Sequence, residues 1–518
     1  MSAPHQQLAK SLELLRLLQE QGRVALRTKE LPRLHRERLL KNGFIRAVMR
    51  GWYVPSSPED TVGESTAWFA SFWGFCAEYL TFRFGDEWCL SPEASLKLHA
   101  GNMTVPSQLF VRAPQASGNI TTLLCNTSIV DVAATVPDNL TKITPWELQA
   151  YSLPAALIAV PEGYFSRNPT DARTALAMVK DASDLLDLLL KGRQSVVAGR
   201  LAGAFRNIGR FEIADSIVKT MHTAGFDTRE NDPFAKPTPV TLSRRIISPY
   251  AGRIRLMWGE MRTAVLEVFP KPPGCPDDVD LYLAEIEEVY AADAYHSLSI
   301  EGYRVSPELI ERVRSGDWNP DADDFDSKHS SALAARGYWE ASRAVHESIR
   351  RILSGENAGI IADKGHGDWY REMFGPSVQA GILQPSDLAG YRNGPVYIAN
   401  STHVPPSHES VRDAMPVFFE LLEDETQPAV RAVLGHFVFV YIHPYMDGNG
   451  RIGRFLMNAM LASGGYPWTV VPMECRDKYM AVLEKASVGQ DIQPFAEFLG
   501  QLVRQSMEGG AQKELPRT

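Results

Sequence analysis

The chain has 518 residues, 44% of them hydrophobic and 22% charged, with a formal net charge of −9 at pH 7. That length exceeds what one hydrophobic core supports, so we expect two or three domains of an ordinary globular protein. The net acidity excludes a surface that is basic throughout. No apolar run reaches the ~20 residues that span a bilayer. Gln, Lys and Glu interrupt Met1 to Gly22, so we expect neither a membrane partner nor a signal peptide.

Five scattered cysteines indicate the cellular compartment. None of them forms a Cys-x-x-Cys pair, which argues against both a zinc site and a disulfide framework. We therefore expect reduced thiols in a cytoplasmic protein. The sequence leaves open whether two copies associate as a homodimer.

The N-terminal segment predicts a DNA-binding module. Residues 8–21, 28–31 and 32–42 have helical character, and an alternating stretch over 44–55 turns at a glycine, which together predict a winged helix-turn-helix over residues 1–58. Between Gly22 and Arg50 the chain has nine Lys or Arg and two acidic residues, a local charge of +7. We expect contacts with double-stranded DNA from Arg33, Arg36, Arg38, Lys41, Arg46 and Arg50. The alternative is a solvated basic face on a small interaction domain.

Residues 59–235 predict one α+β domain without a catalytic constellation. The stretch from Trp68 to Trp88 is strongly aromatic, and with the preceding module the region resembles, in patches, antitoxin-type regulators of the abortive-infection class. Three prolines between Asn231 and Val240 indicate a stiff linker. Residues 236–278 are expected to form a linker and a connecting helix.

Four further segments precede the most informative one. An acidic amphipathic helix is expected from Val279 to Ser297, and an exposed acidic loop from Pro320 to Asp326. Residues 391–406 predict a short strand and a turn stiffened by prolines. Residues 435–442 are rich in β-branched and aromatic side chains, a composition that favours a buried strand.

The most informative stretch is His443-Pro-Tyr-Met-Asp-Gly-Asn-Gly-Arg-Ile-Gly-Arg454. Its glycines let backbone N–H groups face an anion, and the run after Arg451 predicts a helix whose N-terminus favours negative charge. Asp447 could hold Mg²⁺ against phosphate oxygens. Arg451 and Arg454 share a helix face and could bind phosphates through forked donors. His443 could accept a proton from an attacking hydroxyl.

Three other interpretations of this stretch fit less well. An ordinary turn needs neither the flanking His nor two arginines. An EF-hand loop beginning at Asp447 would have Arg451 at its fifth position and Asn458 at its twelfth, where a bidentate Glu is required. The dinucleotide fingerprint G-x-G-x-x-G matches Gly448 to Gly453, but five residues separate it from the preceding apolar run.

His443 to Arg454 resembles the Fic motif, His-Pro-Phe-x-Asp-Gly-Asn-Gly-Arg-x-x-Arg, with Tyr445 in place of the usual Phe. The resemblance extends over about the last half of the chain. It implies an all-helical fold in which the run before His443 is a central helix, and AMP transfer from ATP to a Ser, Thr or Tyr hydroxyl of a target protein. His443 would be the general base and Asp447 the Mg²⁺ ligand. The nucleotide would be bound by Gly448, Asn449, Gly450, Arg451, Arg454, Asn458 and Tyr479.

Two upstream segments resemble control and targeting elements of the same family. Ser297-Leu-Ser-Ile-Glu301-Gly302 resembles its inhibitory motif, which implies that Glu301 pairs with Arg454 in place of the γ-phosphate of ATP. Residues 391–406 resemble its flap, an edge strand that pairs with the backbone of the target. Val396 and Ile398 would then shape the target channel.

We therefore predict a multidomain, predominantly α protein. An all-helical Fic domain with a small β-hairpin flap would cover residues 279–505, followed by a tail over 506–518. The predicted function is AMP transfer with ATP as co-substrate and Mg²⁺ as cofactor, inhibited by Glu301. One alternative is a DNA-binding regulator or antitoxin whose Fic domain senses nucleotide. The other is a Fic enzyme that transfers UMP, phosphate or phosphocholine.

Overall fold

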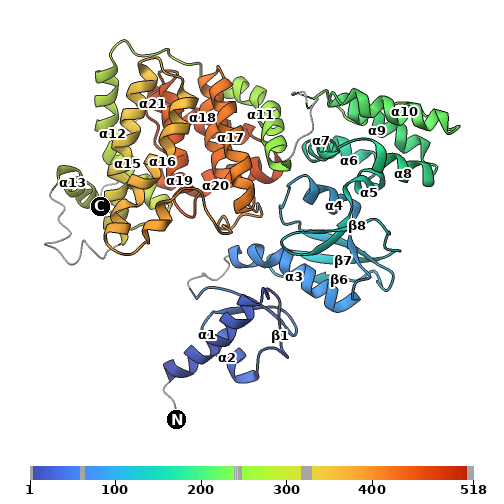
Figure 1. The fold of residues 1–518 in the computed structure, drawn as a ribbon. Coiled ribbons are helices and arrows are strands. Elements are labelled where there is room, and N and C mark those ends of the chain that lie inside the picture. The colour runs from blue at the N-terminus through green and yellow to red at the C-terminus, as the bar shows by residue number, and fades with distance from the viewer. Residues whose placement is uncertain are drawn as a thin grey trace. The chain divides into compact units, whose positions relative to one another are not determined.

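The computed structural model describes residues 4–58, 65–238, 240, 242, 248–316 and 330–509. The chain divides into two compact units (Figure 1). The N-terminal unit comprises Met1–Arg253 and Tyr397–Pro405, and the C-terminal unit comprises Ile254–Val396 and Pro406–Thr518. Among the described residues, no helix is long and apolar enough to cross a membrane.

The first part of the N-terminal unit is a small helix-and-sheet module. Its antiparallel sheet has the strand order β1-β3-β2 and packs through Leu26 and Ile45 against leucines of the two helices. Residues 28–31, expected as a helix, form a turn instead, in which the Glu30 carboxylate accepts the backbone N–H of Arg27 at 2.7 Å. The winged helix stays a prediction. The elements are α1 (Pro4–Glu20), β1 (Leu26–Arg27), α2 (Arg33–Lys41), β2 (Ile45–Met49) and β3 (Trp52–Pro55).

The rest of the N-terminal unit combines helices with two small sheets. One sheet has the order β4-β5-β7-β6, with β5 and β7 parallel, and the other is the hairpin β8-β9. The aromatic helix α3 supplies much of their core. The elements are α3 (Thr66–Phe84), β4 (Cys89–Leu90), α4 (Pro92–His99), β5 (Gln108–Ala113), β6 (Ile120–Thr122), β7 (Ser128–Ala133), β8 (Leu140–Ile143), β9 (Leu148–Tyr151), α5 (Leu153–Ala159), α6 (Gly163–Arg167), α7 (Pro169–Met178), α8 (Ser183–Lys191), α9 (Ser195–Asn207) and α10 (Phe211–Thr223).

The C-terminal unit is helical throughout the residues that the structure describes. Helix α18 packs against α19, and α15 packs against α16. The elements are α11 (Pro249–Val268, which begins in the N-terminal unit), α12 (Val279–Ile300), α13 (Pro307–Ser315), α15 (Ser330–Leu353), α16 (Ala358–Gln379), η1 (Pro385–Leu388), α17 (His408–Asp424), α18 (Pro428–Ile442), α19 (Asn449–Ala462), η2 (Met473–Cys475), α20 (Arg476–Gly489) and α21 (Gln493–Met507).

The expected fold class, multidomain and predominantly α, is confirmed. The central helix before His443 that the resemblance implied is present, whereas the buried strand that the composition of residues 435–442 favoured and the short strand expected within residues 391–406 are not. Residues 435–442 are helical, not a strand, because they belong to α18, which is buried on nearly every face and therefore lacks an amphipathic pattern. Residues 391–406 contain no strand. A strand is defined by its hydrogen bonds to a second strand, and this segment has no second strand beside it within the described residues. The expected acidic loop at 320–326 lies outside the described residues.

Candidate functional site

The Fic-like motif forms the turn between α18 and α19. The Asn449 side chain closes this turn by accepting the N–H of Tyr445 and donating to its C=O, both at 2.9 Å. Gly448 precedes α19 with φ of 78°, and a Cβ there would approach the Phe374 ring to 2.8 Å, so glycine is required on both counts. Tyr445 stacks on Tyr370 with ring centroids 4.0 Å apart. The motif is therefore a rigid turn held by its own side chains.

His443 ends α18 in the left-handed region, with φ of 54° and ψ of 61°. Its Nδ1 lies 3.1 Å from the Val440 carbonyl. Because a carbonyl can only accept, Nδ1 carries the hydrogen in the neutral ring, and Nε2 retains a lone pair. Burial lowers the pKa of His443 to about 4, so the ring is neutral near pH 7. The imidazole can thus accept a proton through Nε2.

The buried guanidinium of Arg392 holds His443 in this strained position. It donates to the carbonyls of His443 at 2.8 Å and Gly394 at 3.0 Å, and also to that of Pro406. The backbone N–H of Arg392 donates to Pro444 at 2.9 Å. No pattern in the sequence indicates this role of Arg392, because its acceptors are main-chain oxygens, two of them distant along the chain.

The N-terminal turn of α19 has the properties of an anion site. The first N–H groups of a helix lack partners within it and carry a partial positive charge. Arg454 and Arg451 are almost fully buried, and within the described residues Arg454 Nη1 and Arg451 Nε have no hydrogen-bond partner. A Cβ at Gly450 would lie 3.3 Å from Arg454 Nη1, so this nitrogen borders the turn. Two unsatisfied buried cationic donors beside a helix N-terminus fit phosphate oxygens.

Two aromatic rings and Asp447 hold the Arg451 side chain in place. Its guanidinium carbon lies 5.1 Å from the ring centroids of both Tyr303 and Phe374. Such contacts restrict a long side chain that would otherwise lose rotamer entropy on binding. Its Nη2 also donates to Asp447 at 3.2 Å.

Glu301 lies against the same turn. Its Oε1 accepts from Arg454 Nη2 at 2.7 Å, and a Cβ at Gly450 would collide with that oxygen. Burial raises the pKa of Glu301, but the charges of Arg454 and Arg451 outweigh burial, so the pKa is lowered and the side chain is an anion near pH 7. Helix α12 ends at Ile300 with Glu301 as its cap, because Gly302 has φ of 89°. A carboxylate of the chain itself therefore sits at the anion site.

Ser297 of α12 binds the other side of the Arg454 guanidinium, and a buried pair between α12 and α15 lies one helical turn earlier. Ser297 accepts from the guanidinium through both Oγ and the main-chain oxygen, each at 2.9 Å. One turn earlier on α12, Asp293 accepts from Tyr338 at 2.6 Å, and burial raises the pKa of this Asp. Neither Asp293 nor Tyr338 was recognised from the sequence.

Asp447 is the motif's exposed carboxylate, with 65% of its side chain accessible. Its Oδ1 accepts the N–H of Gly448 at 2.6 Å. Within the described residues, no group of three or more His, Cys, Asp or Glu side chains could hold a metal alone. One carboxylate completed by waters and phosphate oxygens suits Mg²⁺, which keeps most of its waters. The donor set therefore fits a magnesium ion delivered with a nucleotide.

Three of the expected nucleotide contacts are internal instead. The Asn449 amide is occupied by Tyr445, and the Asn458 amide bonds to both backbone groups of Thr469. The hydroxyl oxygen of Tyr479 lies 2.6 Å from His436 Nε2, and the Tyr479 side chain is buried. Their polar groups are satisfied inside the protein, so the geometry argues against a role for these side chains in holding nucleotide.

The six candidate DNA contacts are spread over α2 and the β2–β3 hairpin. Arg33 pairs with Glu37 at 2.7 Å, and Arg36 donates to the Leu31 carbonyl at 3.3 Å. Arg50 and Lys41 are exposed, whereas Arg38 and Arg46 are half-buried. DNA binding stays a prediction.

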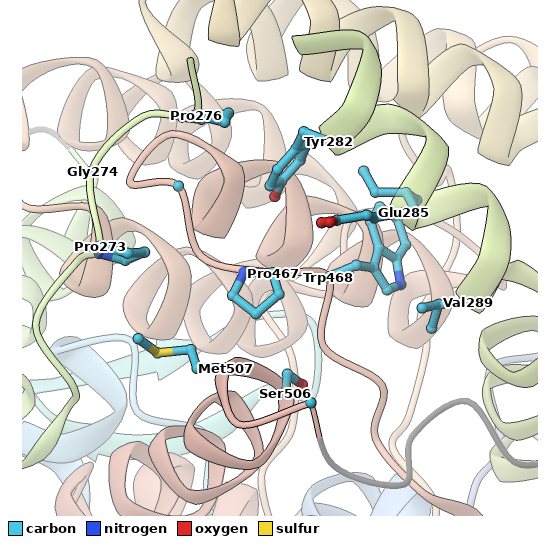
Figure 2. Close-up of a pocket in the computed structure, with 13 residues that line it drawn as sticks. Pro273, Gly274, Pro276, Tyr282, Glu285, Val289, Pro467, Trp468, Ser506 and Met507 are labelled. Atoms are coloured by element: carbon cyan, nitrogen blue, oxygen red, sulfur yellow. The ribbon is translucent and has the colours of Figure 1, made fainter. Parts of the chain in front are cut away.

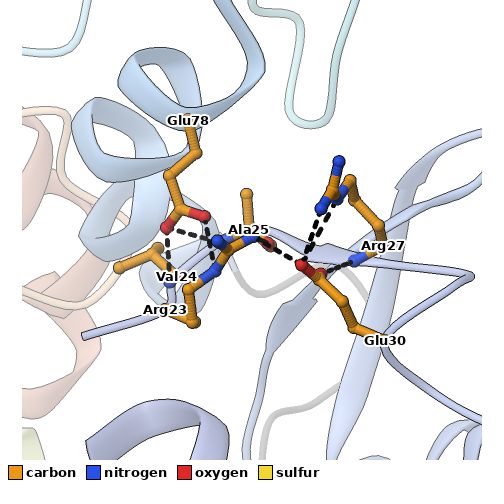
Figure 3. Close-up of polar contacts among 6 residues, drawn as sticks. All are labelled: Arg23, Val24, Ala25, Arg27, Glu30 and Glu78. Atoms are coloured by element: carbon orange, nitrogen blue, oxygen red, sulfur yellow. Dashed lines mark hydrogen bonds and ion pairs between the residues drawn. The ribbon is translucent and has the colours of Figure 1, made fainter. Parts of the chain in front are cut away.

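Two glutamates neutralise part of the local positive charge (Figure 3). Glu30 pairs with Arg23 at 2.8 Å and with Arg27 at 3.0 Å. Glu78 of α3 pairs with Arg23 at 3.0 Å and accepts the N–H groups of Val24 and Ala25. The local charge of +7 between Gly22 and Arg50 does not include Glu78, because this residue is distant in sequence.

A pocket of about 490 Å³ lies elsewhere in the C-terminal unit. Tyr282, Glu285 and Val289 of α12 line it together with Pro467 and Trp468 (Figure 2). No residue of the Fic-like motif lines it. Its lining side chains are mostly apolar, and the one charged group among them is the Glu285 carboxylate, which would repel a triphosphate.

Comparisons with known proteins agree with the motif. Residues 368–461 match the family model described as Fic/DOC family. The chain is 29% identical over 226 residues to a protein named Protein adenylyltransferase Fic from Drosophila willistoni, covering 43% of this chain and 42% of that protein. The protein of the same name from Drosophila melanogaster is 28% identical over 226 residues, covering 43% of this chain and 42% of that protein. The chain thus spans less than half the length of these curated relatives.

A solved structure of Fic-1 from C. elegans is also similar, with a TM-score of 0.37 and 19% identity, covering 66% of this chain and 94% of that one. The family-model match includes His443, Asp447, Arg451 and Arg454, the residues that the structure brings together. Residues 368–461 of this chain are therefore similar to the Fic/DOC family.

Proposed function

We propose that this chain transfers AMP from MgATP to a hydroxyl side chain of a target protein, and that Glu301 restrains the transfer. The main support is one arrangement: a neutral imidazole near a helix N-terminus where two buried arginine nitrogens lack partners. That arrangement provides both a base and an anion site. The similarity to proteins named Protein adenylyltransferase Fic supports the same activity.

In the proposed reaction, His443 Nε2 accepts the proton of the target hydroxyl. The hydroxyl oxygen forms a bond to the α-phosphorus, the bond from that phosphorus to the bridging oxygen breaks, and pyrophosphate leaves. His443 later releases its proton to solvent. Arg451, Arg454 and the α19 N-terminus stabilise the negative charge, which is the main way that such sites accelerate phosphorus chemistry. A Mg²⁺ ion held by Asp447 would neutralise phosphate charge.

Glu301 restrains the reaction by competition. Its carboxylate occupies Arg454 Nη2, a donor that a terminal phosphate needs. ATP must displace Glu301 from Arg454 to bind fully, which weakens binding. ATP that binds without displacing it would have its α-phosphorus out of place, and a misplacement of about 1 Å can lower a rate on the order of a hundredfold.

The acceptor would be a Ser, Thr or Tyr on an extended segment of the target. The backbone of Val396 makes no hydrogen bond within the described residues. An extended backbone with unused donors and acceptors can pair with a second chain. Val396 and Ile398 would then contact the side chains that flank the acceptor.

The test uses ATP labelled at either the α- or the γ-phosphate, with Mg²⁺ and a cell lysate as acceptor. The Glu301→Gly protein should attach label from α-labelled ATP only, and Glu301→Gly/His443→Ala should attach none. Excess unlabelled ATP should suppress labelling more than excess UTP. Attachment of γ-label would indicate phosphate transfer, and absence of any label would contradict the proposal and favour a nucleotide-sensing regulator.

A further inference from the structure

The end of α12, which carries Glu301, is closed by backbone hydrogen bonds. Gly302 donates to the Ser299 carbonyl at 3.0 Å, and Tyr303 donates to the Leu298 carbonyl at 3.1 Å. These bonds satisfy two of the carbonyls that have no partner within a helix at its C-terminus. The next carbonyl along the chain needs a donor from another element.

Arg476, the first residue of α20, supplies that donor. Its Nε donates to the Ile300 carbonyl at 2.9 Å. A guanidinium at a helix C-terminus also interacts favourably with the partial negative charge of the helix dipole. Because Glu301 directly follows Ile300, this contact acts on the residue next to the carboxylate. Arg476 therefore stabilises the turn from which Glu301 reaches Arg454.

His296 connects the same two parts of the fold one turn earlier on α12. The backbone N–H of Met473 in η2 donates to His296 Nδ1 at 3.1 Å. Burial lowers the pKa of His296, so the ring is neutral near pH 7 and Nδ1 can accept. Since η2 runs directly into α20, both contacts join α12 to one continuous segment, residues 473–476. This segment is called the η2–α20 junction below.

Glu301 itself has open space beside it. A pocket of about 430 Å³ lies between the end of α12 and the η2–α20 junction, and Glu301, Gly302, Glu474 and Asp477 are among the residues that line it. The Glu301 side chain is 29% exposed. Close packing around the carboxylate therefore does not fix it in place. Its position depends on where the end of the α12 backbone is held.

We infer that the η2–α20 junction sets the strength of the restraint by Glu301, and that Arg476 and His296 are positioning residues for its carboxylate. This inference rests on the proposed AMP transfer and its restraint by Glu301. A loosened α12 end would let Glu301 leave Arg454 more often, so ATP would bind more tightly and transfer would rise. Neither positioning residue has to contact nucleotide for this effect.

The test removes each contact in the full chain with Glu301 intact. Arg476→Ala deletes the donor, and Arg476→Lys keeps the positive charge but removes the Nε–H. Arg476 is only half-buried, so neither change should impair folding. His296→Phe keeps a ring of similar shape and removes the Nδ1 acceptor. Lys485→Ala is the matched control, because it removes an exposed positive charge from the same helix.

Two quantities are measured for each protein: the Kd for a non-hydrolysable ATP analogue with Mg²⁺, and the α-label transferred to lysate proteins. Arg476→Ala should lower the Kd about threefold, the effect expected from loss of a cation at a helix C-terminus, and should raise label transfer. Arg476→Lys should fall between Arg476→Ala and the wild type. His296→Phe should change both quantities in the same direction, and Lys485→Ala should change neither.

A second background separates positioning from a merely structural role. In the Glu301→Gly protein, Arg476→Ala should change neither the Kd nor label transfer, because no carboxylate is left to position. A general loss of folding would instead affect both backgrounds. Should Arg476→Ala fail to fold, Arg476→Lys and His296→Phe are compared in the same two backgrounds.

The outcomes distinguish this inference from the proposed function. Equal Kd values for the wild type and Arg476→Ala would overturn the inference alone. So would a change of the same size in the Glu301→Gly protein, because Arg476 would then act on the nucleotide or on folding and not on Glu301. A Glu301→Gly protein that labels no acceptor would overturn the proposed function, and the inference with it.

Discussion

Replacement of Glu301 should strengthen nucleotide binding in graded steps. The bond between Glu301 Oε1 and Arg454 Nη2 is 2.7 Å long, and Arg454 is 3% exposed. A hydrogen bond between charged groups contributes about 1.5–3 kcal/mol. Binding of a terminal phosphate has to break it, so Glu301→Gly should lower the Kd for MgATP by about ten- to a hundredfold.

Glu301→Gln tests whether charge or bulk is responsible. Gln keeps the size of the side chain and a neutral hydrogen bond, which has roughly half the strength. The Kd should therefore fall by about fivefold, the equivalent of about 1 kcal/mol. Isothermal titration calorimetry with Mg²⁺ and a non-hydrolysable ATP analogue measures the Kd of the wild type, Glu301→Gln and Glu301→Gly. The control is Glu287→Gln, which changes an exposed residue of the same helix. Equal Kd values for wild type, Gln and Gly would refute the competition.

The remaining predictions concern catalysis. Because the pKa of His443 is lowered to about 4, the base should stay neutral above that value; AMP transfer should be nearly flat from about pH 6 to 8 and fall only as pH approaches 4. A fall centred near pH 6.5 would contradict the buried position of the ring. Asp447→Asn should raise the Mg²⁺ concentration needed for half-maximal rate by about tenfold or more, and an unchanged Mg²⁺ requirement would exclude Asp447 as the ligand. Arg392→Lys loses the fork that reaches three carbonyls, so kcat should fall about tenfold with the ATP Kd unchanged, whereas Arg343→Lys, a change at an exposed residue of α15, should have no effect.

The candidate site was predictable from sequence because its residues are contiguous. Spacing alone placed Arg451 and Arg454 on one helix face, and the structure confirms that both lie in α19. Glu301 is distant in sequence and was found only through resemblance to a known inhibitory motif. Arg392 had no such signal, since its partners are backbone carbonyls whose position depends on the fold.

Side-chain direction was the least predictable property. Asn449 and Asn458 belong to the right helix, but their amides bond inward to Tyr445 and Thr469. A motif specifies which residues occupy a turn, whereas packing decides whether a side chain supports the turn or faces a ligand. Composition also misled at residues 435–442, because a fully buried helix and a buried strand are equally apolar.

The position of bound phosphate tests the central claim most directly. A crystal structure of Glu301→Gly with Mg²⁺ and a non-hydrolysable ATP analogue should place phosphate oxygens at the first turn of α19, within hydrogen-bond reach of Arg451 Nε and Arg454 Nη1, with His443 Nε2 facing the α-phosphorus. An analogue bound elsewhere, or one whose phosphates avoid both arginines, would contradict the account.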